Sequence, residues 1–273
     1  MKKQFQFPLK QGIGAPAVPS VVKGDDVVRG QLIAYPEEGK LGTAIYASVS
    51  GTVTEVTDTA ITVEAAEKQE KTYVPLQGDD PLDLIKKSGL VGLGGAGFPV
   101  YAKLAKPFAE GGTVIVDAAE CEPILSHNID AIEHHPEDLI RGLTIEMEVT
   151  NAAEGVIAIK KKHEKAVKVL QEALEERNGG KPIRLHLLRD MYPMGEERAI
   201  VREVLGQLLP VTALPLEAGA IVSNAETVMR VHEAVDLKKP LIDKDLTIAG
   251  KLAGNENLIQ IFHDVPIGMQ AGD

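Results

Sequence analysis

A glycine-rich run is the part of this sequence best suited to binding a ligand. Its four glycines are Gly92, Gly94, Gly95 and Gly97. They leave backbone amides uncovered by side chains, and residues 98–106 then predict a short helix with Lys103 in its second turn. Amides at a helix start, backed by the positive end of the helix dipole, favour a phosphate. A plain turn is the alternative reading. Because apolar Phe98 follows at once, we favour a phosphate-bearing cofactor.

Three polar clusters each follow a predicted strand further along the chain. Ala119-Glu120-Cys121-Glu122-Pro123 comes after the strand that ends at Asp117, Tyr192-Pro193-Met194-Gly195-Glu196-Glu197 after 183–188, and Ser223-Asn224-Ala225-Glu226-Thr227 after 220–222. Open parallel sheets collect their ligand sites at the carboxyl ends of strands. Helix capping is the alternative for single residues, because Asn224 suits an N-cap and Glu196 or Glu197 a first helical turn. Taken together, the clusters favour a ligand site.

The spelling Gly92-x-Gly94-x-x-Gly97 also fits a dinucleotide fingerprint. Asp117 lies 20 residues after Gly97, where a ribose-binding acid is expected. That fingerprint requires a strand directly before the loop. Residues 83–88 instead have helical composition. A dinucleotide fold is therefore kept only as an alternative.

From about residue 80 the pattern alternates between helices and strands. The predicted strands are 113–117, 156–159, 183–188 and 220–222. The predicted helices are 81–87, 129–150 with a break at Pro136, 163–177, 196–205 and 225–235. This alternation predicts an α/β layer with a largely parallel sheet.

The two ends of the chain are rich in predicted strands. Residues 1–75 contain "KGDDVVRGQLIA" and "ASVSGTV", which resemble the biotinyl/lipoyl-like barrel-sandwich hybrid domain. Lys40 lacks the Met-Lys-Met context of a biotin carrier, so we expect a structural sandwich rather than a swinging arm. Residues 246–249 and 258–262 are strand-like. We therefore expect three parts: 1–75, an α/β domain over 76–240, and a segment 241–273 that continues in a longer protein.

Composition argues against several classes of partner. The net charge of −11 disfavours nucleic acid and anionic lipid, and with no Trp a base-stacking surface is not expected. The most apolar stretch, 204–222, is broken by Pro210 and Pro215, so we expect no direct membrane insertion. A single cysteine, Cys121, excludes a cysteine-ligated iron–sulfur cluster within this chain. We expect no metal site from the His spacing, and a cytoplasmic protein without a signal peptide.

Four motifs together resemble a known family. "GLGGAGFPVYAK", "DAAECEP", "YPMGEE" and "NAET" are similar, in order, to the FMN- and NADH-binding domain of the flavoprotein subunit of respiratory NADH dehydrogenase. A barrel-sandwich start before this domain resembles the RnfC component of the Rnf electron-transport complex. "ECEPILSHN", "DMYPMGEERAIVRE" and "KKPLIDKDLTIAG" resemble the Rnf-C-like electron-transfer proteins associated with D-proline reductase. The segment from Leu241 resembles the start of that family's soluble-ligand-binding β-grasp (SLBB) module.

The resemblance implies roles for individual residues. The loop glycines would line the FMN phosphate and ribityl chain, and Lys103 would neutralise the phosphate. Phe98 would lie near the flavin or nicotinamide, and Glu120 and Glu122 in the nucleotide cleft. The residues implied to contact the flavin ring, NADH or the facing side of the cofactor are Asp117, Tyr192, Gly195, Glu196, Glu197 and Asn224.

The implied function is electron transfer from NADH through FMN to a protein acceptor. That acceptor would be D-proline reductase or an Rnf-type complex, and the electron outlet would lie outside this chain. One departure complicates the prediction, since Asp117-Ala118-Ala119 replaces the family's Asn-Ala-Asp. A carboxylate at 117 would repel a phosphate or a reduced flavin. The alternative function is therefore a non-catalytic docking module with a decayed site.

Overall fold

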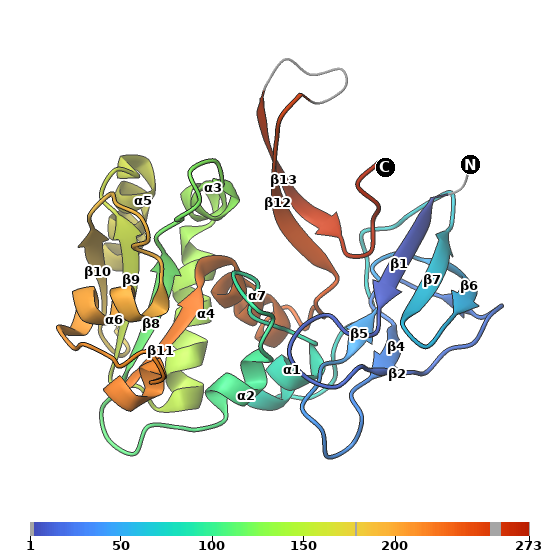
Figure 1. The fold of residues 1–273 in the computed structure, drawn as a ribbon, viewed down its shortest axis with the longest axis horizontal. Coiled ribbons are helices and arrows are strands. Elements are labelled where there is room, and N and C mark those ends of the chain that lie inside the picture. The colour runs from blue at the N-terminus through green and yellow to red at the C-terminus, as the bar shows by residue number, and fades with distance from the viewer. Residues whose placement is uncertain (1–2, 178, 252–257, 273) are drawn as a thin grey trace. The chain divides into compact units, whose positions relative to one another are not determined.

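A computed structural model describes residues 3–177, 179–251 and 258–272 (Figure 1). The chain divides into two compact units. The first unit comprises Met1–Lys103, Glu233–Lys244 and His263–Asp273. The second unit comprises Leu104–His232 and Asp245–Phe262. Each unit is described by itself.

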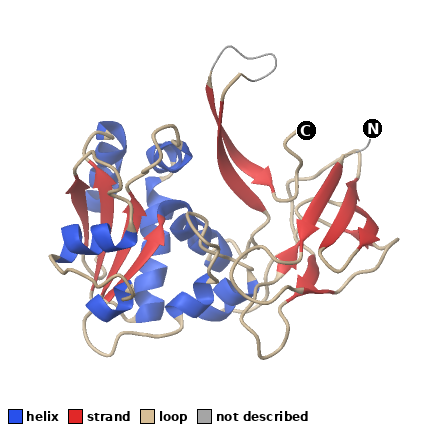
Figure 2. Cartoon of the chain, viewed as in Figure 1, coloured by secondary structure: helices blue, strands red, loops and turns tan. Residues whose placement is uncertain are grey.

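The first unit begins with two small antiparallel sheets. One sheet has the order β1 (Gln4–Pro8), β7 (Ala60–Ala65), β6 (Gly51–Val56), β3 (Asp26–Val27), and the other β2 (Val18–Pro19), β4 (Leu32–Tyr35), β5 (Ile45–Tyr46). Alternation along β1 buries Phe5 and Phe7, which pack with Ile33, Ile61 and Val63 in one apolar core. Figure 2 shows strands and loops but no helix in the described residues before α1. The predicted barrel-sandwich fold is confirmed.

Two short helices flank the glycine loop. The first, α1 (Pro81–Lys87), has Pro81 in its first turn, and its N-cap Asp80 accepts a hydrogen bond from the Asp83 amide. A helix therefore precedes the loop, and the strand required by a dinucleotide fingerprint is not there. The second helix, α2 (Val100–Leu104), is shorter than the predicted 98–106.

The sequence pattern was wrong about the bounds of α2 for a local reason. Pro99 bridges to Val91, and the carbonyl of Phe98 accepts from the Gly92 amide at 2.9 Å, so residues 98 and 99 close the loop instead of starting the helix. At the other end, Pro107 disfavours helical geometry at Lys106.

The second unit is built on a parallel sheet. Its strand order is β10 (Ile183–Leu188), β9 (Glu154–Lys160), β8 (Thr113–Ala118), β11 (Ala220–Asn224), and all three neighbouring pairs are parallel. The crossovers carry α3 (His127–His134), α4 (Pro136–Thr150), α5 (Glu164–Glu176), α6 (Glu197–Leu205) and the 3₁₀ turn η1 (Pro215–Ala218); α7 (Ala225–Val235) follows β11. The predicted α/β class is confirmed, and the predicted break at Pro136 separates α3 from α4.

Side-chain alternation in the central strands explains why helices cover both faces of this sheet. Val114 and Val116 of β8 pack with residues of α3, α4 and α5, whereas Ile115 packs with Ile200 and Val201 of α6. Full burial of one such side chain stabilises by about 1.5–3 kcal/mol. The two apolar layers therefore fix the strand ends, from which the predicted site residues project.

The strand-like segments near the end of the chain form a two-stranded sheet of β12 (Asp243–Ala249) and β13 (Ile259–Pro266). Both strands are longer than the predicted 246–249 and 258–262. Two strands alone do not form an independent core, and their assignment to a β-grasp module stays a prediction. Among the described residues, no helix combines the length and apolar character needed to span a bilayer.

Candidate functional site

The carboxyl edge of the parallel sheet brings together the predicted site residues of the second unit. Asp117 lies near the end of β8, and Asn224 ends β11 directly beside it in register. Glu120 and Glu122 follow β8, while Tyr192, Gly195, Glu196 and Glu197 lie at or after the β10–α6 connection. Open parallel sheets bind ligands at this edge. The structure therefore has these residues at the strand ends, where the sequence pattern predicted them.

Two loops touch at this edge. The Gly195 amide donates to Cys121 Sγ at 2.6 Å. A Cβ at position 195 would lie 2.7 Å from that sulfur, closer than packing allows, and 3.3 Å from the Ala119 Cβ, a tight contact. Gly195 is thus required for the loop after β10 to lie against the loop after β8. Cys121 is partly buried and packs with the apolar layer on the α6 side of the sheet.

The carboxyl group of Asp117 is held in an unusual environment. Its Oδ1 accepts the Ala119 amide hydrogen at 2.9 Å. Burial raises the pKa of Asp117 to about 7; the Ala119 hydrogen bond opposes this, Glu120 and Glu197 add to it, and Lys160 opposes it. Near neutral pH a large fraction of Asp117 is therefore uncharged, and a neutral carboxyl can donate as well as accept a hydrogen bond.

Lys160 is a site residue that the sequence reasoning missed. Three consecutive lysines after an apolar strand, residues 160–162, predict a solvated connector, but Lys160 is only 3% exposed, while Lys161 and Lys162 are exposed. Its Nζ donates to the Glu120 carbonyl at 3.3 Å and lies 3.4 Å from Asp190 Oδ1. The alternation of side chains along a strand could have predicted this burial. Lys160 is the last residue of β9 and lies two positions after Ala158, so both side chains point to the same face of the sheet, the one that α6 covers.

Several predicted residues also have local structural roles. Glu196 caps α6, with Oε2 accepting the Ala199 amide hydrogen at 3.1 Å and Oε1 2.7 Å from Arg198 Nε. Partial burial disfavours its ionisation, but these hydrogen bonds from Arg198 and Ala199 prevail and lower the pKa of Glu196. Asn224 Oδ1 accepts the Thr227 amide hydrogen at 3.3 Å. The capping alternative therefore holds for both residues, and it fixes them at the sheet edge.

The remaining acidic and aromatic residues differ in how firmly they are held. Glu120 has a left-handed backbone with φ of 37°, and its Oε2 accepts from Asn128 Nδ2 at 3.1 Å. Glu122 is exposed, and Tyr192 is 70% exposed. A large exposed aromatic ring beside an acidic edge gives a flat apolar surface for a ligand ring.

The glycine loop belongs to the first unit, where it forms an exposed turn. Gly97 has φ of 69°, and a Cβ there would lie 2.8 Å from the Gly12 Cα. The fold itself therefore explains Gly97. A Cβ on Gly95, in contrast, would meet no atom within 4 Å. Packing does not require glycine at 95, so the uncovered backbone there is available to a ligand.

The helix after this loop contributes less than the sequence suggested. With five residues, α2 has few aligned peptide dipoles, and Lys103 lies in its last turn. Any anion at this loop would be held by loop amides and a lysine, rather than by the start of a long helix. Phe98 is partly exposed beside the turn.

Comparison with protein families divides the chain in two. Residues 85–233 match the Nuo51 FMN-binding domain, and residues 1–78 match the RnfC barrel sandwich hybrid domain. Among solved structures, the air-oxidised NAD⁺-reducing [NiFe]-hydrogenase is similar in fold, with a TM-score of 0.56 at 22% identity over 69% of this chain and 39% of that chain.

Curated relatives extend over most of this chain. The C component of the proton-translocating ferredoxin:NAD(+) oxidoreductase complex of Clostridium ljungdahlii is 33% identical over 262 residues, covering 89% of this chain and 56% of the relative. Cobalamin reductase PduS of Citrobacter freundii is 38% identical over 185 residues, covering 68% of this chain and 38% of the relative. The chain thus spans roughly half or less of the length of these relatives.

Proposed function

Since this chain belongs to the family of the Nuo51 FMN-binding domain, preceded by an RnfC barrel sandwich hybrid domain, we propose that it binds FMN and transfers electrons from NADH to a protein acceptor. The observation that carries the proposal is the carboxyl edge of the parallel sheet, which gathers Asp117, Lys160 and the Gly195 loop within the matched residues. NADH is proposed as donor because the Gly195-Glu196-Glu197 motif is retained, and because an NAD⁺-reducing enzyme has a similar fold.

The residues present fit FMN. At Gly95 the loop offers backbone without a neighbouring side chain, as close approach of a phosphate or ribityl chain requires. Lys103 follows in the same unit as a cation. At the sheet edge, Asp117 can present a neutral carboxyl group to a ring heteroatom, and Lys160 supplies a buried positive charge. The protonated form of Asp117 does not repel an anionic cofactor, and Lys160 attracts one.

When bound, FMN would supply the ring that accepts a hydride and releases electrons. The residues of this chain would then bind and orient. The family resemblance implies phosphate contacts from the loop amides around Gly95 and from the Lys103 ammonium. It implies flavin or nicotinamide contacts from Tyr192, Glu196 and Glu197. Further cofactor contacts are implied for Phe98, Glu120, Glu122 and Asn224. No general acid or base is needed for hydride transfer.

The acceptor is the finer part of the proposal. We propose the D-proline reductase system, making the chain part of a PrdC-like cytoplasmic protein; the support is the motif resemblance around Met191 and Leu241. We keep the division into 1–75, 76–240 and 241–273. Purified D-proline reductase should reoxidise the NADH-reduced flavoprotein faster than an unrelated iron–sulfur protein does. Equal rates of reoxidation by the two proteins would rule out D-proline reductase as the specific acceptor.

One observation favours the docking-module alternative. Above its pKa of about 7, Asp117 would carry a negative charge where the family has an amide. A chain whose site has decayed would serve as a scaffold in a complex. This alternative predicts no flavin binding even below pH 7, where Asp117 is neutral.

FMN titration tests the proposal directly. Purified protein mixed with FMN should quench flavin fluorescence and shift the visible spectrum. Anaerobic NADH should then bleach that spectrum. Protein that leaves millimolar FMN unchanged would contradict the proposal. Binding without bleaching would contradict NADH as the donor.

Gly95→Val is expected to weaken FMN binding at least a hundredfold without loss of stability. A valine side chain would occupy the space left for the cofactor, yet a Cβ at this position meets no protein atom within 4 Å. The measurement is FMN fluorescence quenching, with thermal unfolding followed by circular dichroism. The matched control is Gly39→Val, in an exposed turn where a Cβ also meets nothing within 4 Å; its left-handed φ of 76° makes this a harsher change to the backbone. FMN affinity unchanged by Gly95→Val would remove the loop from the site.

A further inference from the structure

We propose that Asp117 is a protonation-dependent positioning residue: its neutral carboxyl group holds FMN at the sheet edge, and its ionised form weakens that binding. This inference rests on the proposed function. The geometry places the carboxyl near the end of β8, beside Asn224 in register. The Gly195 loop lies against it, because a Cβ on Gly195 would be 3.5 Å from Asp117 Oδ1.

The two carboxyl oxygens of Asp117 have different surroundings. Oδ1 accepts the Ala119 amide hydrogen at 2.9 Å, which holds the side chain in one orientation. A proton on the carboxyl would therefore reside on Oδ2, and the hydroxyl so formed can donate to a ligand acceptor. An amide at this position would keep the Ala119 contact through its carbonyl and would donate permanently. Asparagine is thus a close mimic of the neutral state.

Charges from three elements face Asp117. Glu120 comes from the loop after β8, Glu197 from the first turn of α6, and Lys160 from the end of β9. Ionisation of Asp117 would place three carboxylates against one ammonium at this edge. The ionised form can accept but cannot donate a hydrogen bond, and it adds negative charge beside Glu120 and Glu197. FMN is therefore expected to bind the protonated form, and burial raises the pKa of Asp117 to about 7, within reach of physiological pH.

The test compares the parent protein with Asp117→Asn between pH 6 and pH 8 at fixed ionic strength. For the parent, the Kd for FMN is expected to rise about tenfold over this range, because binding requires a proton whose pKa lies near 7. The variant should lack this rise. The second ionisation of the FMN phosphate, near pH 6, changes the Kd of both proteins alike. The pH profile of the variant therefore measures this contribution, and subtracting it leaves the effect of Asp117. Circular dichroism melting at each pH checks that both proteins are folded.

A second measurement needs no variant. Calorimetric FMN titrations near pH 7.5 in two buffers of different ionisation enthalpy give the number of protons exchanged on binding. Protonation of Asp117 predicts net proton uptake by the parent protein. Preference of the site for the fully ionised phosphate would instead release protons, so the two effects differ in sign.

The outcomes separate this inference from the proposed function. FMN binding by both proteins with the same pH profile, or proton release by the parent, would overturn the role of Asp117 and leave the flavoprotein proposal intact. Absence of binding by both proteins at every pH would overturn the proposed function, and this inference with it.

Discussion

Asp243→Ala is expected to lower the free energy of unfolding of the first unit by about 3–5 kcal/mol, the range for removal of one partner from a buried ion pair. The Asp243 side chain is 1% exposed, and its Oδ2 lies 2.6 Å from Arg29 Nη2 and 3.1 Å from Lys239 Nζ. Both cations are themselves largely buried. Alanine would leave two positive charges in a poorly solvated place without their shared partner.

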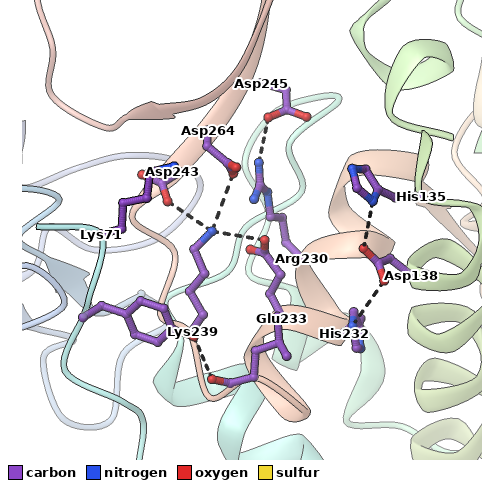
Figure 3. Close-up of polar contacts among 12 residues, drawn as sticks. Lys71, His135, Asp138, Arg230, His232, Glu233, Lys239, Asp243, Asp245 and Asp264 are labelled. Carbon is purple, nitrogen blue, oxygen red and sulfur yellow. Dashed lines mark hydrogen bonds and ion pairs between the residues drawn. The ribbon is translucent and has the colours of Figure 1, made fainter. Parts of the chain in front are cut away.

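Other ion pairs and hydrogen bonds of Lys239 and Arg29 limit the loss of stability in Asp243→Ala. Lys239 Nζ also contacts carboxylate oxygens of Glu233 and Asp264 (Figure 3), at 3.1 Å and 3.6 Å. Arg29 also donates to the Lys71 carbonyl at 3.1 Å. These contacts remain in the variant, so we expect the lower half of the range. Asp243→Asn should cost less than alanine, because an amide oxygen can still accept one of the two hydrogen bonds.

Urea unfolding followed by circular dichroism measures this effect. The matched control is Asp83→Ala in the same unit, which removes the Asp83–Lys87 pair at 2.7 Å, where both side chains are more than two-fifths exposed. Exposed i,i+4 pairs contribute about 0.3–0.5 kcal/mol. A loss below about 1 kcal/mol for Asp243→Ala, similar to the control, would mean that the network around Lys239 compensates fully.

The fold was largely predictable because its elements carry local signals. Pro136 forced the division between α3 and α4, since proline suits a first helical turn but interrupts a continuing helix. The strands β8, β9, β10 and β11 were recognisable as short apolar runs. The bounds of α2 could not be predicted in this way, because a bridge to Val91 across the glycine loop holds Pro99 outside the helix. That contact is not local, and no helix propensity encodes it.

The candidate site was predictable only in outline. Polar clusters after strands indicated which segments meet at the carboxyl edge, and parallel pairing brought Asp117 beside Asn224. Two properties depend on the packed structure. The burial of Lys160 was hidden within a basic run, and the protonation of Asp117 depends on neighbours from other elements, Glu197 and Lys160. Charge type can be read from a sequence, but the desolvation of that charge cannot.

Lys160→Met is expected to weaken FMN binding at pH 7 by at least tenfold. A hydrogen bond from a charged group such as the Lys160 ammonium contributes about 1.5–3 kcal/mol, which corresponds to roughly tenfold or more in Kd. Lys160 opposes the raised pKa of Asp117, so its removal should also move the pH midpoint of FMN binding upward. Methionine fills a similar volume and needs no partner, so stability should change little.

Lys161→Met provides the matched control for this prediction. It makes the same change in net charge one residue further on, at an exposed side chain. A general electrostatic effect would weaken FMN binding equally in both variants, whereas a local role for Lys160 requires a difference of tenfold or more. In the Lys160 variant Asp190 loses its contact with Lys160 but keeps its ion pair with Lys162 at 2.8 Å. Asp190 therefore stays paired, and its loss of one contact does not affect the comparison. FMN affinity unchanged by Lys160→Met would mean that the buried ammonium serves only to hold the Glu120 carbonyl, and that the cofactor lies beyond its reach.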